Sequence, residues 1–91
     1  MKRCLKLIIA GRVQGVFFRK ATKQKADEFG VLGTVRNLDD GQVEVIVHAD
    51  AALLAEFMDW CRQGPLLARV DEVTLIELES YNQQFHSFEI I

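Results

Sequence analysis

The sequence predicts an α+β fold in which two helices pack on one face of a four-stranded antiparallel sheet. Two observations support this prediction. Apolar runs typical of strands are separated by two segments with helical periodicity. The pair Asp40-Gly41, a strong hairpin signal, joins the two halves of the chain. The expected element order is therefore strand, helix, strand, followed by a second strand, helix, strand.

The first strand is expected over about residues 2–10. Leu5, Leu7 and Ile9 alternate on one of its faces, and Ile8 and Ala10 lie on the other. A strand with apolar residues on both faces is typical of a sheet that is covered on both sides. We therefore place this strand at the centre of the sheet.

A helix is expected from about residue 17 to residue 29, and Gly30 predicts that it ends in a left-handed conformation. Polar residues such as Lys20 and Gln24 are expected to point away from the core. The residues expected to face the core form a narrow stripe, at steps of three or four residues: Phe18, Thr22, Ala26 and Phe29.

The hairpin is expected to join a strand over residues 31–37 to an antiparallel partner over residues 42–48. Val43, Val45 and Val47 alternate in the second of these strands and predict its buried face. The opposite face is expected to carry Gln42, Glu44, Ile46 and His48.

A second helix is expected to begin after Asp50, which is a suitable N-cap, and to end at Gly64-Pro65. A strand over residues 70–79 follows, and residues 86–91 are expected to add a short edge strand. The apolar face of the helix is broad: Leu53, Leu54, Phe57, Met58, Trp60 and Cys61.

This order describes the ferredoxin-like split βαβ sandwich, with the first and third strands at the centre of the sheet. The fold hosts unrelated functions, so function has to be inferred from a site. A copper chaperone of this fold needs a cysteine pair in its first turn, which is missing here. An RNA-recognition module needs exposed aromatic residues on its central strands, where Lys6, Gln42, Glu44 and His48 are expected instead.

Composition indicates one globular domain over residues 1–91, with 49% hydrophobic residues. Eleven Lys and Arg against thirteen Asp and Glu give a net charge of −2, which does not favour nucleic acid or an anionic membrane. We expect a cytoplasmic protein, because neither a membrane span nor a signal peptide is evident. Its small size and closed patterning favour a monomer. Cys4 and Cys61 lack metal-like spacing and are expected to be reduced, as are most cytosolic cysteines.

The turn between the first strand and the first helix predicts an anion site. Its glycines, Gly11 and Gly15, allow consecutive backbone N–H groups to face one point at the positive end of the helix. Arg19 lies in the first helical turn, where a cation costs roughly 0.3–1 kcal/mol unless an anion binds beside it. A plain steric turn with a solvated arginine is the alternative explanation.

The segment Gly11-Arg12-Val13-Gln14-Gly15-Val16-Phe17-Phe18-Arg19 is followed eighteen residues after its arginine by Asn37. That asparagine lies within Gly33-Thr34-Val35-Arg36-Asn37-Leu38-Asp39-Asp40-Gly41-Gln42-Val43-Glu44. These paired motifs closely resemble the acylphosphatase family, and the likeness extends over essentially the whole chain. The resemblance implies hydrolysis of small acyl phosphates without a metal or another cofactor.

The resemblance also implies the roles of individual residues. Arg19 would be the catalytic arginine that binds phosphate, and Asn37 would orient the attacking water. The backbone N–H groups of the turn would bind the phosphoryl oxygens, and these are the N–H groups of Gln14, Gly15, Val16, Phe17 and Phe18.

One residue departs from the family pattern. Thr34 stands where a large aromatic residue often precedes the Val-Arg-Asn element, which bears on local packing and on the rim of the site. A non-catalytic domain that binds phosphate or carboxylate through the same turn is the alternative function. His48 and His86 are well separated and are interpreted as ordinary edge or surface residues.

Overall fold

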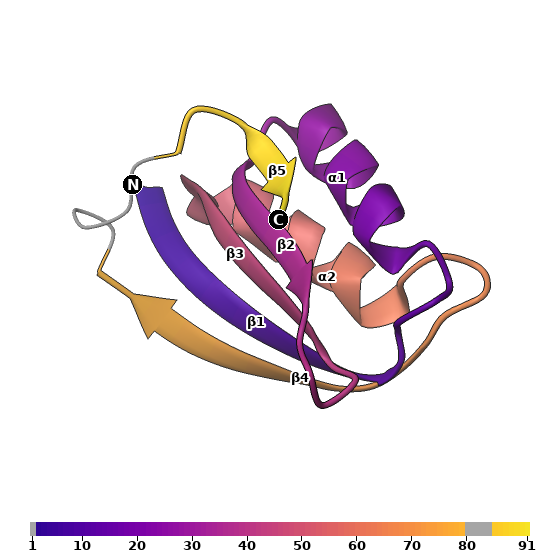
Figure 1. Cartoon of the computed structure of the whole chain (residues 1–91). Helices are drawn as coiled ribbons and strands as arrows, with labels where there is room; N and C mark the ends of the chain where they lie inside the picture. Colours follow the sequence, from indigo (N-terminus) through magenta and orange to yellow (C-terminus); the bar gives the residue numbers. More distant parts are fainter. Residues whose placement is uncertain (1, 80–84) are drawn as a thin grey trace.

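The structure, a computed structural model, describes residues 2–79 and 85–91. Its sheet has the strand order β4-β1-β3-β2-β5 (Figure 1). The predicted order and the central places of the first and third strands are confirmed. The edge strand β5 pairs in parallel with β2, so the sheet is mixed. The elements are β1 (Lys2–Arg12), α1 (Phe18–Phe29), β2 (Leu32–Asn37), β3 (Val43–Asp50), α2 (Ala51–Gln63), β4 (Arg69–Leu78) and β5 (Phe88–Ile90).

Both helices cover the same face of the sheet (Figure 1). The core between the two layers is rich in aromatic contacts. Ring centroids lie 6.1 Å apart for Phe57 and Phe88 and 6.0 Å apart for Phe18 and Trp60. The predicted helix stripes are confirmed, because their central members are fully buried: Phe18, Thr22, Ala26, Leu54, Phe57 and Cys61.

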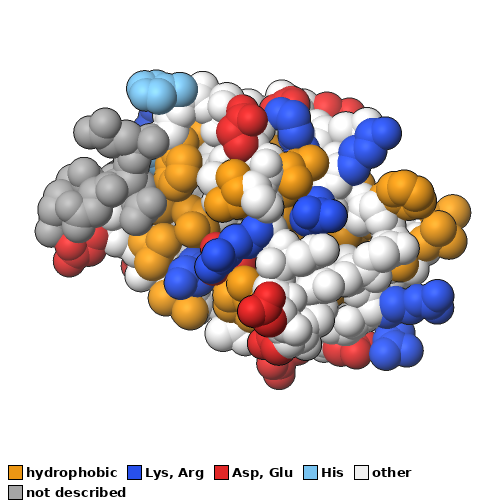
Figure 2. Space-filling view, viewed as in Figure 1, with side chains coloured by type: hydrophobic (Ala, Val, Ile, Leu, Met, Phe, Trp, Pro, Cys, Tyr) orange, Lys and Arg blue, Asp and Glu red, His pale blue; other side chains and the backbone are white. Residues whose placement is uncertain are grey.

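The other face of the sheet is open, and the expectation that β1 is covered on both faces is wrong. Ile8 and Ala10 are only half-buried, because both helices lie on the opposite side. This open face mixes basic, acidic and apolar side chains (Figure 2). Glu44 lies on it as predicted, yet is only 7% exposed, since its carboxylate pairs with the Arg36 guanidinium at 3.1 Å.

The predicted turns form where expected. Gly30 caps α1 with φ 74°, and Gly64 ends α2. The β2–β3 hairpin closes with a hydrogen bond of 2.8 Å from Leu38 N–H to the Gln42 carbonyl. Cys4 and Cys61 are both free, as predicted, and both are buried. Within residues 2–79 and 85–91, no helix has the length and apolar character needed to cross a membrane.

Candidate active site

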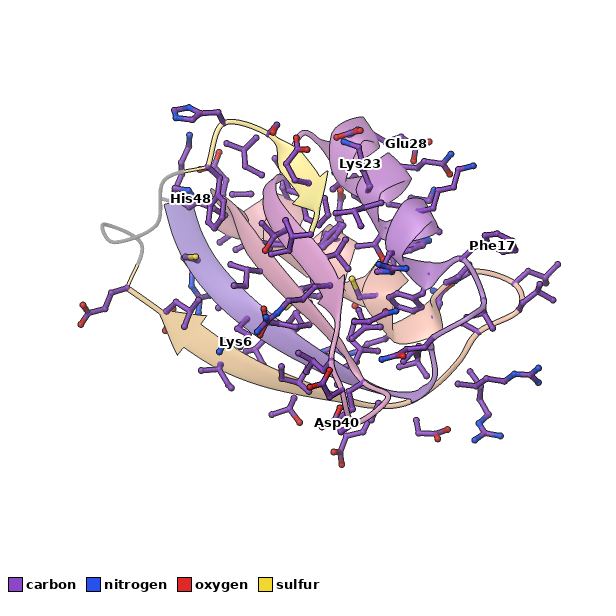
Figure 3. The ribbon with its side chains drawn as sticks, viewed as in Figure 1. Lys6, Phe17, Lys23, Glu28, Asp40 and His48 are labelled. Carbon is purple, nitrogen blue, oxygen red and sulfur yellow. The ribbon has the colours of Figure 1, made fainter. Side chains whose placement is uncertain are left out.

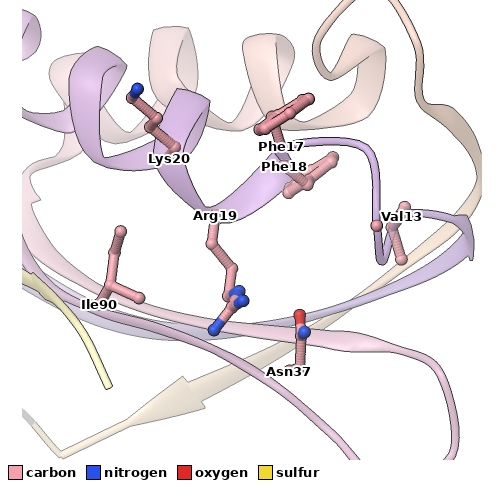
Figure 4. A pocket seen from close by; sticks show the side chains of 8 residues that line it. Val13, Phe17, Phe18, Arg19, Lys20, Asn37 and Ile90 are labelled. Atoms are coloured by element: carbon pink, nitrogen blue, oxygen red, sulfur yellow. The ribbon is translucent and has the colours of Figure 1, made fainter.

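A pocket of about 340 Å³ opens at one end of the sheet, where the turn after β1 enters α1 (Figure 4). The turn, the first turn of α1, the last residue of β2 and the strand β5 all contribute to its wall. Segments distant in the sequence therefore meet at one place. The lining residues are Val13, Gly15, Phe17, Phe18, Arg19, Lys20, Asn37 and Ile90.

The backbone of the turn is left-handed at two residues. Gly15 has φ 75°, and Phe17, the N-cap of α1, has φ 62° and ψ 24°. A left-handed conformation costs a residue with a side chain roughly 1–2 kcal/mol. The Phe17 ring is 73% exposed and projects from the molecule (Figure 3), so its own packing offsets little of that cost. Such conformations make concave groups of N–H donors, which bind anions.

Gly11 has a different role from the one expected. It sits at an irregularity in the pairing of β1 with β4, and its φ is 133°. A Cβ atom at this position would lie 2.1 Å from the Arg69 carbonyl oxygen. Gly11 therefore allows the close approach of β4, and among the two glycines only Gly15 bends the turn at the pocket.

Arg19 extends from the first turn of α1 into the pocket (Figure 4). Within the described part of the chain, no carboxylate forms an ion pair with it, and the first turn of α1 holds no acidic residue. Four other arginines differ, since a carboxylate lies within 3.3 Å of each guanidinium of Arg3, Arg36, Arg62 and Arg69. Arg12 also lacks an ion pair among the described residues, but it does not line the pocket. A cation and a helix N-terminus thus reinforce one another and favour an anion.

Asn37 is the last residue of β2 and shares the helix-covered face with the buried Val35. Its side chain and that of Arg19 both extend into the pocket (Figure 4). The predicted convergence of the two groups on one site is therefore present in the structure. An amide offers both a donor and an acceptor, so it can bind a water and an anionic oxygen together.

The sequence model of the acylphosphatase family matches residues 5–90 of the chain. The chain belongs to the acylphosphatase family. An acylphosphatase from Marinobacter nauticus is 45% identical over 82 residues, which cover 90% of this chain and 88% of the relative. An acylphosphatase from Methylococcus capsulatus is 42% identical over 91 residues, which cover 100% of this chain and 97% of the relative.

The fold is shared with solved acylphosphatase structures. The acylphosphatase from Bacillus subtilis superposes with a TM-score of 0.93 at 32% identity, covering 100% of this chain and 99% of that one. The acylphosphatase from Coxiella burnetii also gives a TM-score of 0.93, at 30% identity, over 99% of this chain and 93% of that one. The predicted ferredoxin-like fold and the predicted family are both confirmed.

In this acylphosphatase-family chain, the residues that line the pocket differ in part from the site residues that were expected. Gln14 and Val16 belong to the turn but do not line the pocket, because Val16 is buried at 6% exposure and the Gln14 side chain faces the hairpin. Val13, Lys20 and Ile90 line it but were not singled out as site residues. Val13 lies within the motif from Gly11 to Arg19, Lys20 directly follows that motif, and Ile90 lies in the edge strand expected over residues 86–91.

Thr34 lies away from the pocket. It is half-buried on the open face of the sheet, where it pairs with Ile46 of β3 and Glu89 of β5. Side chains on successive residues of a strand point to opposite faces, so Thr34 and Asn37 are on different sides of β2. The departure from the family pattern therefore affects the open face rather than the pocket.

Proposed function

We propose that this chain is an acylphosphatase that hydrolyses the carboxyl–phosphate bond of small acyl phosphates to a carboxylate and inorganic phosphate. One observation carries the proposal. The Arg19 guanidinium has no carboxylate partner within the described residues and shares its pocket with Asn37 at the positive end of α1. Family membership points to the same reaction.

The phosphoryl group would be held by Arg19 and the turn. The planar guanidinium carries paired donors that match two phosphoryl oxygens. The third oxygen would accept hydrogen bonds from backbone N–H groups between Gln14 and Phe18. Of these residues, Gly15, Phe17 and Phe18 line the pocket and are the best placed.

Asn37 would orient the attacking water. Its amide oxygen accepts a hydrogen bond from the water, and its amide N–H reaches a phosphoryl oxygen. Transfer of a phosphoryl group passes through a loose transition state that asks little of the nucleophile. A positioned neutral water is therefore sufficient, and positioning is the chief contribution that the site has to make.

The leaving group explains why no general acid is needed. Cleavage of the bond between phosphorus and the bridging oxygen releases a carboxylate, which is stable as an anion at neutral pH.

We propose that residues 1–91 act as one domain and as a cytoplasmic monomer, on a small substrate and without nucleic acid. Two free buried cysteines fit a reducing compartment.

The test compares wild type with Asn37→Ala on benzoyl phosphate, with an aryl phosphate ester as the control substrate. We expect wild type to hydrolyse benzoyl phosphate and not the ester. Asn37→Ala should lower kcat by about 10²–10³, the loss typical for one oriented hydrogen-bonding group. Saturable phosphate binding by wild type without turnover would instead favour the non-catalytic domain, and an unchanged kcat in Asn37→Ala would remove the role assigned to Asn37.

A further inference from the structure

Gln14 connects the turn to the hairpin that carries Asn37. Its side-chain nitrogen Nε2 donates one hydrogen bond of 2.8 Å to the Leu38 carbonyl oxygen and another of 2.8 Å to the Gln42 carbonyl oxygen. These contacts span 24 and 28 residues of sequence. Gln14 directly precedes the left-handed Gly15, and Leu38 directly follows Asn37, so the bridge joins the two parts of the pocket.

The sheet itself does not make this connection. The turn leaves from β1, whereas Asn37 ends β2, and β3 lies between these strands. Within residues 2–79 and 85–91, the hydrogen bonds between residues 13–17 and residues 37–42 are the two that Gln14 donates. The side chain of Gln14 therefore ties the turn to the hairpin that carries Asn37, in addition to the packing of α1 against β2.

The chemistry of the bridge requires an amide. Both partners are carbonyl oxygens, which accept hydrogen bonds and cannot donate them, so the NH₂ group must face the hairpin. Both amide hydrogens are then used. The Gln42 carbonyl also accepts the Leu38 N–H at 2.8 Å, so the same bridge supports the closing bond of the hairpin.

We propose that Gln14 is a positioning residue of the phosphatase site, which sets the place of Asn37 relative to the phosphoryl group bound by Arg19 and the turn. The inference rests on the proposed function. The side chain of Gln14 acts through Asn37 and does not touch the substrate, because it faces the hairpin and is absent from the pocket wall. A misplacement of about 1 Å is enough to cost up to about 10²-fold in rate.

A double-mutant cycle distinguishes the proposed positioning role of Gln14 from a role in stability alone. We expect Gln14→Met to lower kcat for benzoyl phosphate by about 10-fold to 10²-fold, while the inhibition constant of inorganic phosphate changes by less than about twofold. In the Asn37→Ala background the same substitution should lower kcat by less than about twofold, because residues that act as a unit are not additive. An equal loss in both backgrounds, or no loss in wild type, would overturn the proposal.

The exposed Gln24 of α1 supplies a matched control, and Gln24→Met is expected to retain wild-type kcat. Gln14→Asn is a second variant, which keeps the amide but is too short to reach both carbonyls. The side-chain amide resonances of Asn37 give a readout that does not need turnover. They should shift in both Gln14 variants and not in Gln24→Met, and unchanged resonances in the Gln14 variants would contradict the proposal.

Wild-type turnover separates this inference from the proposed function. If wild type does not hydrolyse benzoyl phosphate, the proposed function fails. The Asn37 resonances then decide alone whether Gln14 places Asn37. If wild type hydrolyses benzoyl phosphate, and Gln14→Met has the kcat and the Asn37 resonances of wild type, the proposed function stands and the role assigned to Gln14 is wrong.

Discussion

The two helices begin in opposite ways, although each follows a strand and covers the same face of the sheet. Before α1, the N-cap Phe17 is left-handed, and the first turn carries Arg19 and no acidic residue. Before α2, the N-cap Asp50 is extended, with φ −63° and ψ 149°, and its carboxylate makes no capping hydrogen bond but places an anion at the positive end of the helix. The beginning of α2 thus has a negative charge of its own, and that of α1 has an added positive charge.

The difference separates a structural helix start from a functional one. A chain selected only for stability would place a residue such as Asp, Asn or Ser before α1, and would avoid a left-handed phenylalanine. The unfavourable features of the α1 start become favourable when an anion is bound, because the guanidinium and the N–H groups then share a partner. The comparison therefore supports the proposal that stability is exchanged for anion binding at this pocket.

The largest expected effect is at Arg19. Arg19→Ala should lower kcat/KM for benzoyl phosphate by about 10³-fold or more, the scale known for arginines that stabilise a transferring phosphoryl group. Arg19→Lys should restore little, since an ammonium group does not reproduce the two-oxygen fork. Steady-state kinetics of the purified variants measure both effects. Near-wild-type activity in Arg19→Lys would show that charge alone is sufficient.

The next effect is at the turn itself. Gly15→Ala should lower the free energy of unfolding by about 1–2 kcal/mol, because an alanine would be held at φ 75°. A Cβ atom there would meet no atom within 4 Å, so the cost is confined to the backbone. Affinity for inorganic phosphate should fall as well, which denaturant unfolding and calorimetric titration would measure.

Gly30 at the other end of α1 is the matched control. Its φ is 74°, and a Cβ atom there would also meet nothing within 4 Å. Gly30→Ala should therefore lower the free energy of unfolding by a similar amount and leave phosphate affinity unchanged. Equal losses of phosphate affinity in the two variants would mean that the turn has no special part in anion binding.

The smallest effects should have opposite signs at the two helix starts. In buffer without phosphate, Asp50→Ala should lower the free energy of unfolding by about 0.3–1 kcal/mol, because it removes an anion from the positive end of α2. Arg19→Ala should raise it by a similar amount, because it removes a cation from the positive end of α1. Both changes should shrink at high salt. A loss of stability in Arg19→Ala would contradict the comparison.

Much of the fold could be predicted because the patterns are local. The alternation of Val43, Val45 and Val47 predicted the buried face of β3, and Gly30 predicted the end of α1. The placement of Arg19 and Asn37 in one pocket was expected from the paired motifs rather than from periodicity. A resemblance over the whole chain carries tertiary information that a local pattern lacks.

The remaining features depend on contacts that no local pattern encodes. The left-handed conformation of Phe17 contradicts the preference of aromatic residues, so sequence reasoning would assign it elsewhere. The role of Gly11 depends on the approach of Arg69, and the bridge from Gln14 depends on a hairpin 24 residues away. The burial of Ile8 was overestimated, because an isoleucine can occupy either a half-buried or a fully buried position in a strand.

A titration of the 15N-labelled protein with inorganic phosphate, followed through its backbone amide resonances, tests the central claim most directly. The account predicts saturable shifts at Gly15, Phe17 and Phe18, no comparable shifts in the first turn of α2, and loss of the shifts in Arg19→Ala. Shifts of equal size at both helix starts, or shifts at the α1 start that persist in Arg19→Ala, would contradict it.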